Sequence, residues 1–280
     1  MAAESESPAR SAETEKLWNE TGVDPVELHL GKDSGFTLRA YRMSDTLPGA
    51  KADEAAAEAE GEDEDALEEP SDAADEDETV PVKDALAEDE DAPEPDAADF
   101  ADEEPDASED EVDALDADPE EIPLFLTRKG KLLLFRDAEA LVAYVKENDD
   151  HDLAAIDEYA ELQERLTADD VACDEADTYE LDLVVANLRG GHDAWEPELL
   201  IKAAEVGRDL GHALKNDSVN ASLAPGSPLD DLDETFRVVV EGGLRGKLAK
   251  RRLKKNDSQQ AAIAWRGVIA KVNDHVEWRG

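Results

Sequence analysis

The residues with the clearest chemical character are seven cations within eleven positions near the C-terminal end of the chain. They are Arg245, Lys247, Lys250, Arg251, Arg252, Lys254 and Lys255. Such a cluster attracts nucleic acid or another anionic partner. No aromatic side chain is interleaved to stack on bases, and the chain carries a competing polyanion of its own. We therefore expect a solvated basic helix, or a docking site for the acidic part of the same chain, in preference to a DNA-binding surface.

The other residues that commonly do chemistry form no catalytic or metal-binding motif. The chain lacks a GxSxG nucleophile motif, a GxxxxGK[ST] phosphate loop and a GxGxxG turn. Its histidines also lack the HExxH spacing that places two imidazoles on one helix face. These histidines are His29, His151, His192, His212 and His275. We predict that the protein is not an enzyme and has neither a metal site nor a cofactor.

A single cysteine, Cys173, limits both the redox chemistry and the compartment of the protein. It excludes an intramolecular disulfide, a cysteine zinc cluster and an iron–sulfur site. The carboxylates around it in DDVACDEAD raise the pKa of a thiol, so we expect an inert side chain. The N-terminal residues have no signal-peptide pattern, and no apolar stretch is long enough to span a membrane. These features predict a cytoplasmic protein without membrane insertion.

The charge of the chain is concentrated in its middle. The 280 residues carry a net charge of −47, and residues 51–121 contain 35 acidic and 2 basic residues. Phe100 is the one aromatic residue of this segment, and most of its apolar residues are alanine. Burial cannot offset an ordering cost of about 1–2 kcal/mol per residue in such a segment. We expect it to be a disordered insert that acts as a solvating spacer, with recruitment of basic partners as the alternative.

Apolar periodicity predicts two β-hairpins on either side of this insert. Val26, Leu28 and Leu30 alternate with polar residues, and a second alternating run, FTLRAYR, follows the turn GKDSG. Beyond the insert, Lys129 and Gly130 join LFLTR to KLLLF as a two-residue turn. We therefore predict a small antiparallel sheet. Because loop-closure entropy grows only logarithmically with length, a long insert between neighbouring strands is tolerated.

Helical patterns dominate the rest of the chain. We expect a helix over AEALVAYVKEN, with Asp137 as its cap, and a second, short helix over residues 152–165. YELDLVVANL favours a strand or an extended link. Further helices are expected from Glu196, from Ser227 and from about Ser258. Ser227 can cap its helix, with Pro228 as the first helical residue and Asp230 at the capping-box position. Gly242 and Gly243 should end this helix.

The predicted fold is α+β, with a helical C-terminal half. Its segments are a disordered N-terminus (1–23), the first hairpin of an α+β domain (24–48), a disordered acidic insert (49–121), the remainder of that domain (122–190) and a helical C-terminal domain (191–280). Docking of Leu17 and Trp18 on the domain is the alternative for the N-terminus. Three aromatic residues of the helical half are candidates for an apolar binding surface, although for the two tryptophans among them, as for Trp195, we first expect a place in the core or in a half-exposed groove. They are Phe236, Trp265 and Trp278.

Two runs of sequence resemble a known family. They are LFLTRKGKLLLFRDAEALVAYVKENDDHDL and the SPLDDL helix with the later AWRGVIAKVNDHVEW. The family consists of actinobacterial cytosolic proteins often labelled "primosomal protein" or "DNA primase", and one branch is regarded as protein-export chaperones. The resemblance covers residues 24–42 and 122–280. It implies a strand-rich N-terminal half and a helical C-terminal half with an apolar groove for client proteins; the acidic insert departs from the family pattern.

Two functions follow from these observations. The first is a chaperone or adaptor whose helical half binds apolar segments of client or partner proteins, while the acidic insert keeps the complex soluble. The alternative is a primosomal or DNA-replication accessory protein that binds nucleic acid through the basic helix around Arg251. A primase activity has no support, because a single cysteine excludes a cysteine-rich zinc module.

Overall fold

The computed structural model describes residues 10–46 and 119–280. Most of the predicted acidic insert therefore lies outside the described residues. The described residues on its two sides lie next to each other, because the Ser44 amide donates to the Glu120 carbonyl at 2.8 Å and the Glu120 amide donates to the Ser44 hydroxyl at 3.2 Å. The insert thus joins two residues that already lie side by side.

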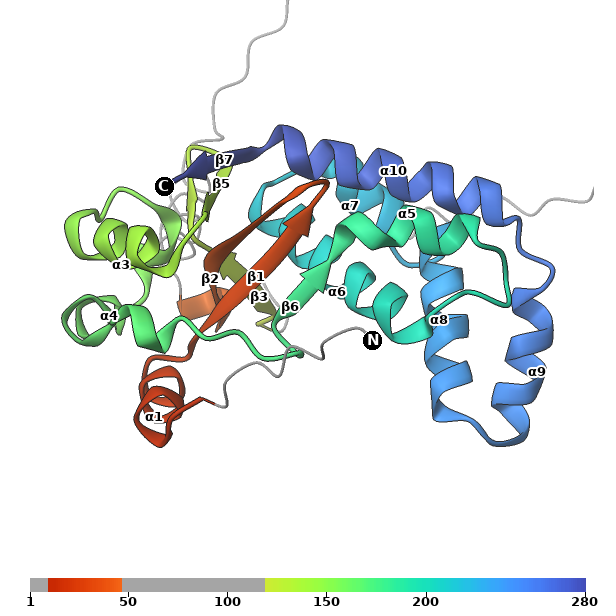
Figure 1. Cartoon of the computed structure of the whole chain (residues 1–280), viewed down its shortest axis with the longest axis horizontal. Helices are drawn as coiled ribbons and strands as arrows, with labels where there is room; N and C mark the ends of the chain where they lie inside the picture. Colours follow the sequence, from red (N-terminus) through yellow and green to blue (C-terminus); the bar gives the residue numbers. More distant parts are fainter. Residues whose placement is uncertain (1–9, 47–118) are drawn as a thin grey trace, which may run out of the picture. The chain divides into compact units, whose positions relative to one another are not determined.

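The described residues contain one β-sheet whose strands come from distant parts of the sequence (Figure 1). The strands are β1 (Val23–Leu30), β2 (Asp33–Met43), β3 (Glu121–Phe125), β4 (Thr127–Arg128), β5 (Lys131–Phe135), β6 (Thr178–Glu180) and β7 (Val276–Arg279). Their order is β4-β5-β2-β1-β6, with β3 also paired to β2 and β7 to β5. Both predicted hairpins are present, and Lys129 and Gly130 take the positive φ values of 53° and 72° that the second turn needs.

The sheet is mixed, whereas we predicted an antiparallel one. Strand β6 runs parallel to β1, and β7 runs parallel to β5. Parallel neighbours need long connections between them, and here helical segments supply those connections. The α+β class with a helical C-terminal half is confirmed. The last residues of that half form β7, however, so the helices are tied back to the sheet.

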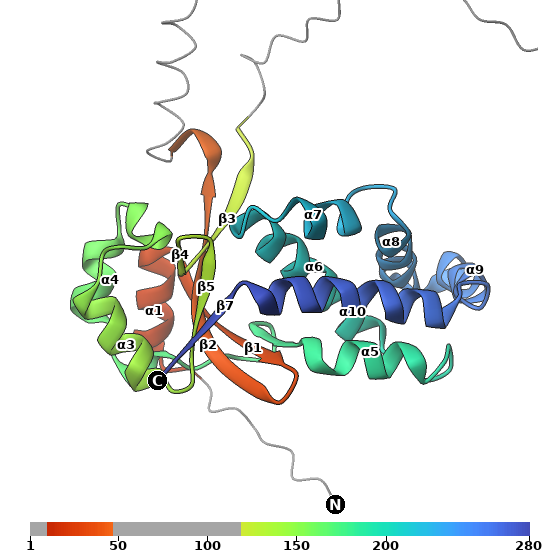
Figure 2. The same cartoon turned by 90° about the horizontal axis from the view of Figure 1, so that it is seen from above.

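Helices cover both faces of this sheet (Figure 2). One face carries α1 (Ala12–Thr21), α3 (Ala138–Glu147) and α4 (Tyr159–Arg165). The other carries α5 (Leu181–Arg189), α6 (Pro197–Ala213), α7 (Asp217–Leu223), α8 (Pro228–Glu241), α9 (Gly243–Leu253) and α10 (Ser258–Asp274). Successive residues of β5 alternate between the two cores: Leu133 packs with the first group, and Leu132 and Leu134 pack with the second.

Among the described residues 10–23, the predicted N-terminal disorder is wrong. Helix α1 begins where Ser11 accepts a hydrogen bond from the Thr14 amide at 3.1 Å, and it ends at Gly22 in the left-handed conformation. Leu17 and Trp18 are each 3% exposed and pack in the smaller core. Burial of these two large side chains explains why so polar a segment is ordered.

The segment YELDLVVANL is also not the extended element that we predicted. Only its first two residues belong to β6, and α5 begins at Leu181. Leu181, Val184 and Leu188 are buried at spacings of three and four, the helical period. The same residues carry a weak period of two over Leu181, Leu183 and Val185, so tertiary packing decides between the two patterns.

Predictions based on local capping chemistry are confirmed. Asp137 accepts from the Ala140 amide at 2.7 Å, Ser227 accepts from the Asp230 amide at 3.2 Å, and Gly242 ends α8 with a φ of 76°. The Asp230 carboxylate accepts from the Gly226 amide at 2.9 Å, rather than from the Ser227 amide as a capping box would require. Gly243 starts the next helix, so the interruption between α8 and α9 is brief.

Candidate protein-binding cleft

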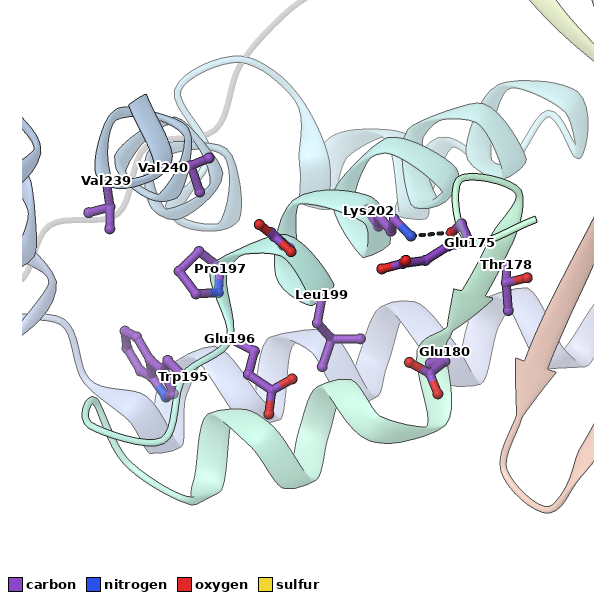
Figure 3. Close-up of a pocket in the computed structure, with 11 residues that line it drawn as sticks. Glu175, Thr178, Glu180, Trp195, Glu196, Pro197, Leu199, Lys202, Val239 and Val240 are labelled. Atoms are coloured by element: carbon purple, nitrogen blue, oxygen red, sulfur yellow. Dashed lines mark hydrogen bonds between the residues drawn. The ribbon is translucent and has the colours of Figure 1, made fainter. Parts of the chain in front are cut away.

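An open cleft of about 580 Å³ lies between strand β6, the start of α6 and the end of α8 (Figure 3). Residues from these separate segments meet there, and both apolar and acidic side chains line it. The lining residues are Glu175, Thr178, Glu180, Trp195, Glu196, Pro197, Glu198, Leu199, Lys202, Val239 and Val240. We call this site the cleft.

Helix α5 fixes the position of one end of the cleft. The side-chain amide of Asn187 donates to the Ala194 carbonyl at 3.1 Å and accepts from the Glu196 amide at 3.1 Å. The Trp195 indole donates to the Leu188 carbonyl at 2.9 Å. These three bonds hold the segment before α6 against the end of α5, and Pro197 then provides the first helical residue.

A charged clamp joins the two helices that form the cleft walls. The Arg208 guanidinium of α6 donates to Asp230 at 2.7 Å and to Asp233 at 2.8 Å, both on α8. Asp233 also accepts from Arg237 at 3.3 Å, and its side chain is only 4% exposed. Because the bonds to Arg208 are charge-assisted and directional, they restrict how far α6 and α8 can move apart.

The apolar part of the cleft combines buried and exposed side chains. Trp195 is buried, Leu199 and Val239 are half-buried, and Val240 is 51% exposed. Behind Trp195 lies Phe236, with the two rings in an edge-to-face arrangement at 5.6 Å between centroids. The cleft therefore presents an apolar surface that is supported by the core.

The charged part of the cleft is strongly acidic. Glu175, Glu180, Glu196 and Glu198 are all exposed. Within residues 10–46 and 119–280, none of these four carboxylates forms an ion pair with a lysine, arginine or histidine. The cation of the cleft, Lys202, donates to the main-chain carbonyl of Glu175. The cleft thus combines a negative potential with the apolar side chains of Leu199, Val239 and Val240, which we call its apolar floor.

The predicted basic patch is placed on a different surface. Its seven cations lie on α9 or in the two residues that follow Leu253, and all of their side chains are exposed. Lys254 contacts Asp193 at 3.5 Å; the other six have no ion pair in the part of the chain that the structure describes. Leu244 and Leu248 are exposed beside them, and Leu248 lines a smaller groove of about 340 Å³ against α8.

The predicted apolar surface is wrong for two of its three residues. Phe236 is 1% exposed and Trp265 is 3% exposed, because both lie in the larger core. Trp278 is half-buried in β7, where its ring lies 5.1 Å from the Arg136 guanidinium and against Gly35. A Cβ at Gly35 would come within 2.8 Å of the Trp278 ring, so a glycine is needed there.

Sequence reasoning missed the residues that line the cleft. Val239 lies on the predicted apolar stripe of its helix, but nothing in the sequence indicates that Val240 lines the same cleft as Trp195 and Leu199. The four glutamates were also hidden, because a chain with 75 acidic residues offers no local contrast. The available signal was Glu196-Pro197-Glu198, a helix start that places two carboxylates beside an aromatic residue.

Cys173, the single cysteine of the chain, is buried. Burial raises the pKa of the Cys173 thiol, and the neighbouring carboxylates of Glu27 and Asp177 raise it further. The described ranges contain no cluster of three or more histidine, cysteine, aspartate or glutamate side chains placed to bind a metal ion. No helix within them has the length and apolar character needed to cross a bilayer.

Comparisons with known proteins identify the family. The family model of the SatS C-terminal domain matches residues 107–273, which is more than half of the chain. A solved structure, described as the crystal structure of the SatS C-terminal domain in complex with bromine, has a similar fold with a TM-score of 0.55. The two sequences are 19% identical, and the match covers 94% of this chain and 96% of that one. A search of curated proteins found no match. The chain belongs to the SatS C-terminal domain family.

Proposed function

We propose that the protein is a non-enzymatic chaperone or adaptor that binds apolar segments of client proteins in the cleft. The observation that carries this proposal is the cleft itself, an open concave surface whose lining includes the apolar side chains of Trp195, Leu199, Val239 and Val240. Membership of the SatS C-terminal domain family, which fits a chaperone-like, secretion-related role, supports it. The two comparisons give no support to the replication-linked alternative.

The dimensions of the cleft suit short apolar segments of a client. A volume of about 580 Å³ accepts a few side chains and leaves them partly in contact with water. Burial of one leucine-sized side chain contributes about 1.5–3 kcal/mol, and binding must also offset the ordering of the segment. Affinity for any one segment is therefore modest, as suits a protein that holds and releases clients.

The acidic insert has a separate role in this proposal. Its 35 acidic residues would surround a bound client with charge and hydration, which opposes association of the complexes. Because Arg42 and Ile122 are paired on neighbouring strands, removal of residues 51–121 leaves chain ends that a short link can join. The insert can thus be tested apart from the cleft.

The same proposal places the protein in the cytoplasm. Cys173 is a single buried thiol, which suits a reducing compartment.

Light scattering of an aggregating client protein tests the function. We expect the full chain to suppress the scattering, and we expect V240E to lose about half or more of this effect, because it places a charge on the apolar floor. The matched control is I263E. Ile263 is a similarly exposed apolar residue, 58% exposed against 51% for Val240, but it lies on α10 outside the cleft.

The outcomes separate the two parts of the proposal. A chain without residues 51–121 should still bind the client but form complexes that precipitate at lower concentration. If neither the full chain nor this shortened form suppressed scattering, the chaperone role would be wrong. Equal loss in V240E and I263E would contradict the cleft as the binding site.

A further inference from the structure

We infer that the cleft prefers apolar segments that carry lysine or arginine beside the apolar residues. This inference rests on the proposed function and defines the class of client. It follows from the placement of four carboxylates around one apolar floor, none of them in an ion pair within residues 10–46 and 119–280. A client with a basic flank would gain contacts in the cleft that a neutral or acidic segment would lack.

The carboxylates are spread along the cleft and do not gather at one point. Glu196 and Glu198 lie at the start of α6, beside Trp195 and Pro197. Glu175 and Glu180 lie farther along, near Lys202 and Thr178 (Figure 3). A segment whose apolar side chains occupy the floor would therefore have a carboxylate near it at either end.

The cation of the cleft does not cancel this charge. Lys202 is held by the main-chain carbonyl of Glu175, on the β6 side of the site. Glu196 and Glu198 have no cationic partner among the described residues. Carboxylates that line one partly apolar surface add to its negative potential, and this potential attracts an incoming cation.

The cations of the basic patch also leave the cleft acidic. Different residues of α8 face the two sites: Val239 and Val240 line the cleft, whereas Glu234, Thr235 and Val238 line the groove against α9. The charges of α9 are therefore not part of the cleft lining. The negative potential of the cleft remains available to a client.

The expected preference is moderate. One exposed ion pair strengthens an interaction by about 1.5- to 5-fold. A segment with two basic residues should accordingly bind about 2- to 25-fold more tightly than its neutral counterpart, because the two factors multiply. Since the carboxylates are exposed, salt should remove most of this difference while the apolar contribution remains.

Three fluorescent peptides that share one leucine-rich core test the inference. Their flanks carry two lysines, two glutamines or two glutamates, and their affinity for the full chain is measured by fluorescence anisotropy at low salt and at 0.5 M NaCl. The test variant is E196Q/E198Q. The matched control is E139Q/E147Q, which removes the same charge from two exposed positions of α3, on the other side of the sheet.

We expect the lysine peptide to bind most tightly and the glutamate peptide most weakly, with the order lost at high salt. E196Q/E198Q should reduce the lysine preference to less than about twofold and leave the affinity for the glutamine peptide unchanged, whereas E139Q/E147Q should keep the preference.

Equal affinity for all three peptides would overturn the inference and leave the proposed function intact. Equal loss in both variants would assign the preference to net charge, and weaker binding of every peptide to E196Q/E198Q would assign these glutamates to folding. Either result would overturn the inference. Absence of binding by any peptide would contradict the proposed function itself.

Discussion

The cleft and helix α9 both expose apolar side chains beside charges, but they differ in shape and in sign. Val240, at 51% exposure, lies in a concave site with four carboxylates; Leu244, at 82% exposure, lies on a helix with seven cations in and directly after it. A concave site surrounds a bound side chain with apolar contacts, whereas a protruding helix touches it from one side. Exposure alone therefore does not identify the binding surface.

The two regions also differ in how firmly they are held. The cleft walls are fixed by Asn187, by the Trp195 indole and by the Arg208 clamp. Helix α9 has only three buried residues, Gly246, Ala249 and Leu253, and two of them have little or no side chain. A preformed site loses less entropy when a client binds. The following predictions test this contrast, from the largest expected effect to the smallest.

Removal of the ring behind the cleft should have the largest effect. Phe236 is 1% exposed and packs edge-to-face on Trp195, so we expect F236A to lower the free energy of unfolding by about 3–5 kcal/mol. Urea denaturation measures this change. A loss below about 1 kcal/mol would instead indicate the exposed surface position that the sequence suggested.

Loss of the clamp should have an intermediate effect. R208Q leaves Asp230 and Asp233 without their guanidinium partner. We expect the free energy of unfolding to fall by about 1–3 kcal/mol and client binding to weaken. The effect on stability is limited because the Arg208 side chain is 32% exposed. The matched control is R128Q, whose partner Asp150 is exposed and whose loss should cost less than about 1 kcal/mol. Equal effects of the two variants on denaturation would show that the clamp has no special role.

Replacement of the most exposed leucine should have the smallest effect. We expect L244S to change the free energy of unfolding by less than about 0.5 kcal/mol, because its side chain makes few contacts in the folded chain. We also expect unchanged suppression of client aggregation. A large loss of suppression would move the client site from the cleft to α9.

Features set by neighbouring residues could be predicted from the sequence. The helix caps at Asp137 and Ser227 and the turn at Lys129-Gly130 depend on local chemistry, and all three are present. The burial of Leu17 and Trp18 depends on a core in which most of the other residues lie more than 100 positions away. That helix was therefore missed.

Features set by distant residues could not be predicted. Strand β7 joins β5 across more than 140 positions, and the cleft brings Glu175, Trp195 and Val240 together from three separate elements. Each of these residues looks ordinary within its own segment. Their function depends on an arrangement that no spacing rule contains.

The most direct test of the cleft is site-specific photocrosslinking. A photoreactive amino acid is placed at position 240 in the cleft and, in a second variant, at position 263 on α10, and each variant is irradiated with an unfolded client protein. We expect crosslinks to the client from position 240 and few or none from position 263. Equal crosslinking from both positions, or crosslinking from position 263 alone, would contradict the assignment of the cleft as the client-binding site.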